Sequence, residues 1–430
     1  MTTNPNVGKT AFRPMAICCG LFFILGFITW ANGTLIPFLK IACNLETDLQ
    51  AFFVTFASYI AYFFLALPSS VIIKKIGFQN GLVVSLIILG LGSLIFIPAA
   101  DNRSYGLFLT GIFIQGSGMA LLQTAVNPYL SIIGPIDSAA QRISIAGFFN
   151  KSAGIIVPIL FGTLFLKDAQ KVTAKLEATT DLVQKNAILD DLLQRVHTPY
   201  ISLAIIFVAF AIFLKFTHLP EVDMDAEEES SAESGTVAAK KTSIFQYPHL
   251  FLGALAIFFC VAVEVMAGDI IGVYARELKV DPFFTTYATA FTLSCMLIGY
   301  IIGIISIPRF VSQQMALRIC TIIGITFTVI SVFTTGTTSF IFVALLGIAN
   351  SLMWPAIFPL GIKGLGKFTK TGSAIMIMGI AGGAIWPLIY GLLKDHLHID
   401  FQHAFLYAMV PGYLYIMYFS IAGHKVGKTN

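Results

Sequence analysis

Long apolar runs alternate with short polar segments along almost the whole chain, from residue 14 to residue 423. Each run holds about 20 residues or more, which is enough for a helix to cross the roughly 30 Å hydrocarbon core of a bilayer. The expected spans are 14–39, 49–73, 80–99, 105–133, 142–167, 199–218, 246–275, 283–307, 314–334, 338–362, 371–394 and 403–423. The pattern predicts an all-α membrane protein with twelve transmembrane helices.

A polar segment between the fifth and sixth runs, Lys167 to Thr198, keeps apolar residues at helical spacing. These residues are Leu182, Ile188, Leu192 and Leu193. Residues three or four positions apart share one face of a helix, so this spacing is typical of an amphipathic helix. The segment is predicted to form such a helix and to cap the fifth and sixth spans.

A second polar segment, Glu221 to Lys241, reads EVDMDAEEESSAESGTVAAKK and is acidic first, then rich in Ser, Gly and Ala. Such a composition is too polar to bury and is typical of a flexible linker. Because the segment falls in the middle of the chain, it divides the spans into two sets of six. The predicted domains are residues 1–218, a linker at 219–245, and residues 246–430.

Proline-marked segments recur in the two halves of the chain. Pro128 in QTAVNPYL and Pro359 in MWPAIFPL lie 231 residues apart, and each precedes a polar turn and another apolar run. Those runs carry Pro158 and Pro387, which lie 229 residues apart. Repeated halves in a membrane chain are typical of a transporter whose binding site lies where the halves meet.

Composition agrees with the membrane interpretation, since 57% of the residues are hydrophobic and 11% are charged. Soluble domains carry about 25% charged residues. The net charge is +4, and the positive residues lie between apolar runs instead of forming a basic face, so no nucleic-acid partner is expected. The six cysteines lie mostly within apolar runs without metal-ligand spacing, and are interpreted as small buried apolar side chains.

Lys and Arg are distributed unevenly between the two sets of loops. With both termini in the cytoplasm, the inner loops and tails hold far more basic residues than the short outer loops, as the positive-inside rule requires. Lys74, Arg142, Lys240 and Lys363 all fall on the inner side. Cytoplasmic termini and a cytoplasmic linker are therefore predicted.

Amide side chains inside the apolar runs are a first candidate site, because unpaired polar groups are costly in hydrocarbon. Gln123 and Asn127 are four residues apart in the fourth span and share a helix face. Asn32, Asn150 and Asn350 add further amides. Amides offer the paired donors and acceptors that sugar hydroxyls need. Hydrogen bonding between helices is the alternative interpretation.

Charged residues within the spans are a second candidate site. Lys151 in the fifth span should face a cavity or an acid. Glu264 and Asp269 in the seventh span are five residues apart and need not share a face, but an unwound helix beside Gly268 would let them converge. A carboxylate in the membrane can carry a proton or bind Na⁺. The alternative is a fixed ion pair with Lys151.

Aromatic residues accompany these polar groups. Trp30 lies beside Asn32, and Trp354 and Trp386 lie in the repeated proline segments. Sugar C–H faces stack on aromatic rings while sugar hydroxyls bond to amides. The candidate substrate-binding residues are Asn32, Tyr59, Gln123, Asn127, Asn150, Lys151, Asn350, Trp354 and Trp386, and the candidate cation-coupling residues are Glu264 and Asp269.

Three motifs carry a family resemblance: QTAVNP at 123–128, MWPAIFPLGIKGLG at 353–366, and TGSAIMIMGIAGGAIWP at 371–387. Through them the chain resembles the major facilitator superfamily, and within it the fucose–galactose–glucose:cation symporter family, over essentially all twelve spans. The resemblance implies two pseudo-symmetric six-helix bundles, a sugar cavity between them, and symport by alternating access. Bacterial glucose/galactose permeases are more similar than fucose permeases, which implies a bacterial inner membrane.

Two positions depart from the pattern of fucose permeases. Those proteins carry an aspartate in the first span where this chain has Gly33, and a glutamate in the fourth span where it has Gln123. Both proton-carrying acids of those relatives are therefore replaced, whereas Glu264 matches a glutamate of glucose-type members. Glu264 and Asp269 are the carboxylates that remain within the spans, so the hypothesis is that coupling depends on them, with Lys151 pairing Glu264 until a cation binds.

The sequence thus predicts a secondary active transporter of a hexose, such as glucose or galactose, coupled to Na⁺ or H⁺. A uniporter in which Lys151 balances Glu264, a non-transporting sugar sensor, and a drug or lipid exporter are the alternatives. An enzyme is not expected, because the sequence has no nucleophile–base pair, metal cluster or nucleotide loop. The expected partners are a sugar and the lipid bilayer, with no cofactor besides the coupling ion, no structural metal site, and a monomeric protein.

Overall fold

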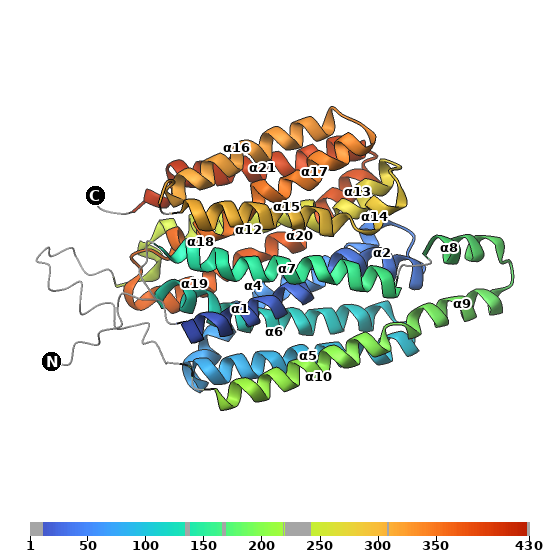
Figure 1. Ribbon diagram of the computed structural model, residues 1–430, viewed down its shortest axis with the longest axis horizontal. Helices are drawn as coiled ribbons and strands as arrows, with labels where there is room; N and C mark the ends of the chain where they lie inside the picture. The colour runs from blue at the N-terminus through green and yellow to red at the C-terminus, as the bar shows by residue number, and fades with distance from the viewer. Residues whose placement is uncertain are drawn as a thin grey trace, which may run out of the picture.

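The computed structural model describes residues 12–133, 138–165, 169–217, 219, 242–307 and 309–427. These residues form long helices that run side by side in one elongated bundle (Figure 1). Twelve helical stretches among the described residues are long and apolar enough to cross a membrane. The prediction of an all-α protein with twelve spans is therefore confirmed.

Six of these stretches come from the first half of the chain. Its helices are α1 (Phe12–Thr29), α2 (Asn32–Ala42), α3 (Asp48–Ala51), α4 (Phe53–Ile76), α5 (Phe78–Asp101), α6 (Tyr105–Ile132), α7 (Ala139–Phe165), α8 (Ala169–Ala178), α9 (Leu182–Gln194) and α10 (His197–Phe216). Most of the predicted linker at 219–245 lies outside the described residues, so the domain boundaries stay predictions.

The second half supplies the other six stretches. Its helices are α12 (Pro248–Gly268), α13 (Ile271–Glu277), α14 (Pro282–Thr286), α15 (Ala288–Ser306), α16 (Gln313–Val332), α17 (Gly336–Ser351), α18 (Met353–Ile362), α19 (Thr369–Met378), α20 (Gly382–Gly391) and α21 (Phe401–Ile421). Short helical turns η4 (Gly379–Ala381), η5 (Leu392–His396) and η6 (Gly423–Lys425) adjoin α19, α20 and α21.

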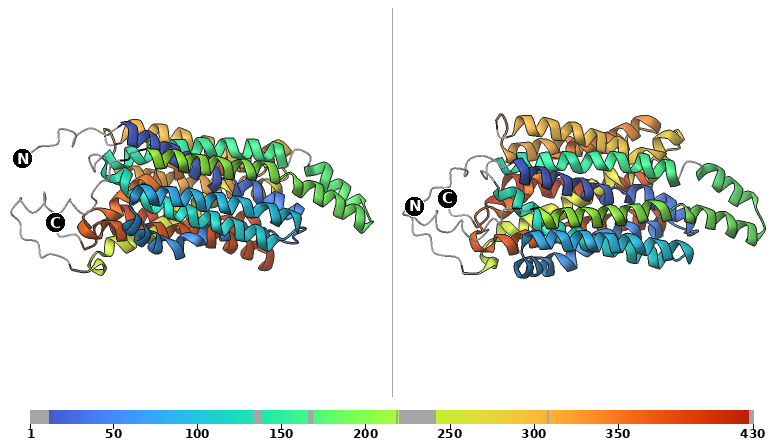
Figure 2. Two further views of the ribbon diagram at one scale, coloured as in Figure 1. Left: turned by 90° about the horizontal axis from the view of Figure 1, so that it is seen from below. Right: turned by 60° about the horizontal axis from the view of Figure 1, so that its bottom comes forward.

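The two halves pack directly on each other. Helix α7 contacts α15 and α18, and α4 contacts α19 and α20. The beginning of α1 and the turn η6 lie at one end of the bundle, while α8 and α9 project from the other, which we call the outer end (Figures 1 and 2). A cavity between the halves is therefore bounded by long helices from both.

The first and seventh spans hold equivalent places in the two halves, and both are broken. Trp30 and Ala31 separate α1 from α2, and Asp269 and Ile270 separate α12 from α13. Glycine is less stable in a helix than alanine by about 1 kcal/mol, so interrupting the helix beside Gly268 costs little. The predicted unwinding at this glycine is confirmed.

Helices α8 and α9 form a pair that projects beyond the bundle (Figure 2). Leu192 and Leu193 of α9 are buried, whereas Leu182 at its start is exposed. Arg103, in the turn after α5, donates to Asp190 Oδ1 at 2.6 Å, and α9 packs against α5 and α2. The predicted amphipathic helix is present and packs beside α5 and α2. The segment reaches the bundle through α8 as well, since Val172 is buried in the core and Thr173 and Ala174 line a cavity next to α2 and α13.

Candidate functional site

A central cavity lies between the two halves of the bundle. Helices α1, α4, α6 and α7 supply one side of its wall, and α12, α15, α18 and η4 supply the other. The residues that line it are Phe22, Leu25, Thr29, Trp30, Tyr59, Tyr62, Gln123, Ile143, Gly147, Asn150, Lys151, Val261, Glu264, Val265, Tyr300, Trp354 and Ile380. Amides, aromatic rings and one acid–base pair thus meet in a single space, which is the arrangement expected of a polar-ligand site in an apolar scaffold.

A buried ion pair crosses this cavity. Lys151 Nζ on α7 donates to Glu264 Oε1 on α12, so the pair joins the two halves of the chain. The side chains are only 7% and 12% exposed. The Lys151 ammonium also lies 4.1 Å from the centroid of the Trp30 ring. Removing one partner of a buried pair leaves an uncompensated charge, which costs about 3–5 kcal/mol, so each charge depends on the other.

The amides of the cavity wall are oriented by aromatic partners. Gln123 Nε2 donates to the Tyr62 hydroxyl at 2.9 Å, and Trp30 Nε1 donates to Asn150 Oδ1 at 3.1 Å. The Tyr59 and Tyr62 rings stack with their centroids 6.5 Å apart. An amide has four hydrogen-bonding positions, so Gln123 and Asn150 keep capacity for a ligand. Fixed amides beside stacked rings suit a ligand with both hydroxyls and apolar C–H faces.

The structure brings six of the sequence-predicted residues into the cavity wall. They come from five different spans and from both halves: Tyr59, Gln123, Asn150, Lys151, Glu264 and Trp354. Their convergence follows from the packing of α7 on α15 and α18 and from the position of α12 beside them. The predicted contact between Lys151 and Glu264 is present.

Four predicted substrate-binding residues lie outside this wall. Asn127 donates from its amide nitrogen to the backbone oxygen of Gln123 at 3.1 Å, so it contacts the helix turn that carries Gln123 without lining the cavity. Asn350 accepts from the Tyr413 hydroxyl at 2.9 Å, within the second half. Trp386 donates to a backbone carbonyl and packs edge-on against two phenylalanines, and Asn32 is buried with its amide nitrogen unpartnered. The structure therefore does not bring these four residues into the cavity wall, and their role in binding stays a prediction.

Asp269 does not share the central cavity with Glu264. It lines a separate cavity of about 480 Å³ near the outer end, together with Gly33, Thr285 and Thr289. Asp269 is 1% exposed, and its carboxylate lies beside the Tyr59 hydroxyl and the Gly33 backbone N–H. The two carboxylates thus line different cavities, yet they lie close enough to interact electrostatically, with Tyr59 near both. Within the described residues, no cluster of three or more His, Cys, Asp or Glu is placed to hold a metal ion.

Tyr300 is a cavity residue that the sequence prediction does not include. It reaches the cavity from α15 because Gly147 on α7 leaves room for its ring. A Cβ atom at Gly147 would lie 2.7 Å from a Tyr300 ring carbon. The only sequence signal is a tyrosine between Gly299 and Gly303 in an apolar run, which by itself does not distinguish a cavity from ordinary packing.

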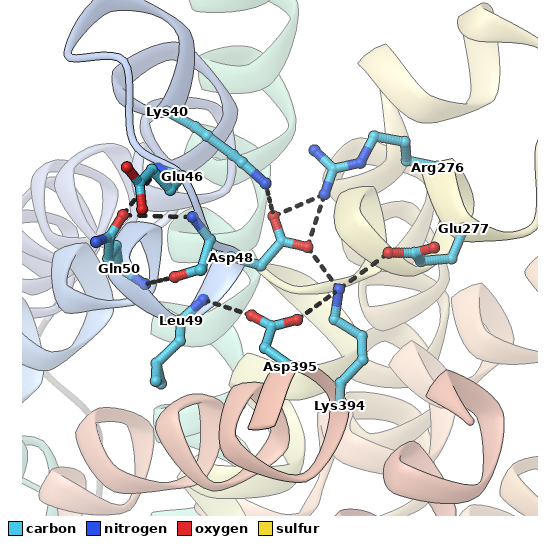
Figure 3. Close-up of polar contacts among 10 residues, drawn as sticks. Lys40, Glu46, Asp48, Leu49, Gln50, Arg276, Glu277, Lys394 and Asp395 are labelled. Atoms are coloured by element: carbon cyan, nitrogen blue, oxygen red, sulfur yellow. Dashed lines mark hydrogen bonds and ion pairs between the residues drawn. The ribbon is translucent and has the colours of Figure 1, made fainter. Parts of the chain in front are cut away.

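An ion network joins the two halves at the outer end (Figure 3). Asp48, at the start of α3, accepts from Arg276 Nη2 at 2.7 and 2.8 Å and from Lys394 Nζ at 2.7 Å. Lys40 donates to the same carboxylate, whose side chain is 5% exposed. Asp395 accepts from the Leu49 backbone N–H at 3.0 Å. The first half therefore supplies Asp48 and Lys40, and the second half supplies the remaining cations, so the network closes the bundle above the central cavity.

Comparisons with known proteins agree with this architecture. A sequence profile of the Major Facilitator Superfamily matches residues 18–390. A glucose/galactose transporter of Brucella abortus is 35% identical over 408 residues, which cover 94% of this chain and 92% of that protein. The L-fucose-proton symporter of Escherichia coli K12 is 31% identical over 386 residues, covering 89% of this chain and 87% of that protein.

Solved structures are similar over nearly the whole chain. The crystal structure of the E. coli fucose:proton symporter FucP aligns with a TM-score of 0.76 and 28% identity, covering 98% of this chain and 100% of that one. A second crystal structure, of the transporter FucP in the outward conformation, aligns with a TM-score of 0.75 at the same identity and coverage. The likeness therefore extends over both halves and the cavity between them.

Proposed function

Because the chain belongs to the Major Facilitator Superfamily, we propose that it is a secondary active transporter that carries a hexose in symport with a cation. Its relatives are named as a glucose/galactose transporter and an L-fucose-proton symporter, and they match it over most of their length. The prediction of a transporter instead of an enzyme is confirmed by these relatives. The predicted fold, a major facilitator bundle, is confirmed as well.

A hexose fits the chemistry of the central cavity. Gln123 and Asn150 present amides whose orientation is already set, and Trp354 and Tyr59 present rings at the same wall. Hydroxyl groups and C–H faces of a sugar match these two kinds of surface. Glucose, galactose and related hexoses are the proposed substrates, and a drug or lipid exporter would favour a cavity with fewer amides.

The ion pair across the cavity is the observation that carries the proposal of cation coupling. Lys151 and Glu264 are buried and belong to different halves. A proton or Na⁺ that binds the Glu264 carboxylate replaces the ammonium as its positive partner, so the link between the halves loosens only when a cation is bound. Movement of the loaded cavity is then tied to the cation, which is the requirement for symport.

Asp269 is the proposed second cation-coupling residue. Its buried carboxylate lines the outer cavity and interacts electrostatically with Glu264 of the central cavity. Two buried carboxylates near each other are costly unless a cation or a proton accompanies them. We therefore place Asp269 on the route by which the coupling ion, Na⁺ or H⁺, reaches Glu264 from the outer side.

The setting proposed for this transport is a bacterial inner membrane. The twelve spans make the chain a multi-pass membrane protein. The excess of Lys and Arg in the inner loops supports cytoplasmic termini and places the outer end away from the cytoplasm. The transporter is proposed to work as a monomer, with the lipid bilayer and the sugar as its partners and without a cofactor other than the coupling ion.

Sugar uptake into proteoliposomes tests the proposal directly. Na⁺ and H⁺ gradients are imposed separately on vesicles that contain the wild-type protein or Glu264→Gln. We expect one ion to drive uptake above equilibrium in the wild type, and we expect the variant to lose this accumulation while it retains sugar exchange.

The same experiment tests the uniporter alternative, which one observation favours: Lys151 already neutralises Glu264 in the closed bundle. Uptake that stops at equilibrium under both gradients would exclude symport and support a uniporter with an internal cation. No sugar uptake or exchange under any gradient would favour a sugar sensor.

A further inference from the structure

Trp30 occupies the break between α1 and α2 and is almost completely buried, at 1% exposure. Its indole contacts two neighbouring residues of α7 in different ways. The Nε1–H donates to Asn150 Oδ1 at 3.1 Å, and the ring lies 4.1 Å from the Lys151 ammonium. Asn150 itself donates to Phe22 O of α1 at 3.2 Å, so the position of the ring relative to α7 is held at two points.

Two glycines make a slot for this ring. A Cβ atom at Gly154 of α7 would lie 2.5 Å from Trp30 Cδ1, and one at Gly268 of α12 would lie 2.4 Å from Trp30 Cζ3. Atoms cannot approach so closely, so only glycine fits at both positions. The slot has one wall in each half of the chain, and the indole therefore stays beside Lys151 in a fixed orientation.

The proposed coupling step creates a charge problem that the indole can solve. When the coupling cation neutralises Glu264, the Lys151 ammonium loses its anionic partner inside a buried cavity. An unpaired buried charge is unstable. The face of an indole is the strongest aromatic site for a cation, and this one already lies within contact distance.

We propose that Trp30 is a positioning residue that holds the Lys151 ammonium while the coupling cation occupies Glu264. This inference rests on the proposed symport. The cation binds the carboxylate, the ammonium keeps its proton and its charge, and the indole takes over as the main partner of the ammonium. Because the ring is fixed in its slot, the ammonium stays close enough to return to Glu264 when the cation leaves.

Because Trp30 holds the Lys151 ammonium, the face of its ring is not available to stack on the sugar. Aromatic rings in a sugar cavity are expected to stack on the sugar, but this ring already carries the ammonium. Trp354, Tyr59 and Tyr62 also line the cavity and remain as stacking surfaces. A change to the π face of Trp30 should therefore alter the response to the cation more than the response to the sugar.

Few other titratable groups face the pair. Tyr59, Tyr62 and Tyr300 line the same cavity, and Cys260 lies one turn before Glu264 on α12. Asp269 lines the outer cavity but interacts electrostatically with both Lys151 and Glu264, so it also faces the pair. Fluorination of the indole acts on the ammonium that the ring contacts, so a stepwise shift in cation dependence is assigned to Lys151 and the carboxylates that it faces.

Fluorinated tryptophans inserted at position 30 provide the test. Each fluorine weakens the negative face of the ring but leaves its shape and its N–H donor in place, so the slot and the bond to Asn150 persist. The measurement is sugar uptake into proteoliposomes at increasing concentrations of the coupling cation and at one fixed sugar concentration. The indole stabilises the Lys151 ammonium most when the coupling cation occupies Glu264. Weakening the ring face should therefore raise the half-saturating cation concentration stepwise, by about threefold to tenfold across the series.

The same substitutions at Trp386 are the matched control. That ring packs against Phe258 and Phe259 and donates to Ala408 O, away from Lys151. Its fluorination should leave the cation dependence unchanged. A half-saturating cation concentration that stays constant across the Trp30 series, in a protein that does respond to the cation, overturns the role of Trp30 alone. Uptake that is independent of any cation in the unsubstituted protein overturns the proposed symport and this inference together.

Discussion

Amide side chains inside this bundle have two roles, and their exposure to the cavity distinguishes them. Gln123 lines the central cavity; it donates to Tyr62 and accepts from Asn127, which leaves one donor and one acceptor position for a ligand. Asn350 is 1% exposed and bonds to Tyr413 and to the backbone of α12. The first is placed to bind a ligand, whereas the second stabilises the second half of the chain.

Replacing these two amides by alanine should separate binding from stability. Gln123→Ala removes donors and acceptors from the cavity wall, so the sugar concentration for half-maximal uptake should rise by about tenfold. Asn350→Ala leaves the buried Tyr413 hydroxyl without its acceptor, and should lower the free energy of unfolding by about 1–3 kcal/mol. Uptake kinetics and thermal unfolding of both variants measure the two effects. A raised half-maximal sugar concentration in Asn350→Ala, with unchanged stability, would place that residue at the sugar site.

Broken helices are the feature that organises the site at the scale of elements. The breaks in the first and seventh spans begin directly after Trp30 and Asp269. The backbone N–H of each of these residues still bonds four residues back, but the N–H of Ala31 bonds three residues back and that of Ile270 bonds five residues back. Each break lies beside the other half of the chain, since Gly268 of α12 touches the Trp30 ring. Close packing of these broken helices, more than their individual stability, therefore determines the shape of the cavity.

Glycine-to-alanine substitutions on both sides of the break in the seventh span should have opposite effects. Alanine is favoured over glycine in a helix by about 1 kcal/mol, and Gly272 in α13 has room for it, with Thr285 O 3.7 Å from a built Cβ atom. Gly272→Ala should therefore raise thermal stability slightly. Gly268→Ala places a Cβ atom 2.4 Å from Trp30, and should lower stability by about 1–3 kcal/mol through overpacking.

Thermal unfolding of the two purified variants in detergent is the measurement. The pair is well matched, because the two glycines are four residues apart and the substitutions are identical. Equal stability of the two variants would show that the Trp30 slot opens without cost.

The whole molecule is closed at its outer end by charges from both halves. Asp48 is the shared acceptor of the network, and Arg276 and Lys394 reach it from the second half. Because Asp48 is buried and pairs with several cations, separating it from them is costly, and the carboxylate therefore stabilises the closed arrangement. A solved relative has been captured in the outward conformation, and in such an arrangement the two sides of this network would have to part.

Neutralising Asp48 should therefore shift the population toward a form that is open at the outer end. Asp48→Asn removes the anion that holds the two halves together there. Its effect is measured with a cysteine placed at Thr289, in the wall of the outer cavity, in a protein whose native cysteines have been replaced. A membrane-impermeant thiol reagent should label this cysteine severalfold faster in Asp48→Asn than in the parent.

Glu277→Gln is the control for this prediction. Glu277 bonds to Lys394 at 2.9 Å, but both residues belong to the second half, so its loss does not break a link between the halves. Labelling should stay at the parent rate in this variant. Identical rates for Asp48→Asn and Glu277→Gln would mean that the network does not hold the outer end closed.

Much of this organisation follows from the sequence alone. The twelve spans are a local property, because a run of about 20 apolar residues is long enough to cross a bilayer wherever it occurs. The contact between Lys151 and Glu264 is predictable for a related reason, since charges in a membrane interior are few and each needs a partner. The break beside Gly268 follows from the low helix propensity of glycine.

The direction in which each helix faces was decided only by the tertiary structure. Spans that meet lipid on one side and protein on the other are apolar all round, so periodicity does not reveal which amide faces the cavity. Gln123 and Asn150 reach the cavity whereas Asn350 does not, and Glu264 and Asp269 open into different cavities. The contact between Asp48 and Lys394 joins residues 346 positions apart. Such contacts depend on how whole halves pack against each other, and no local pattern in the chain records that packing.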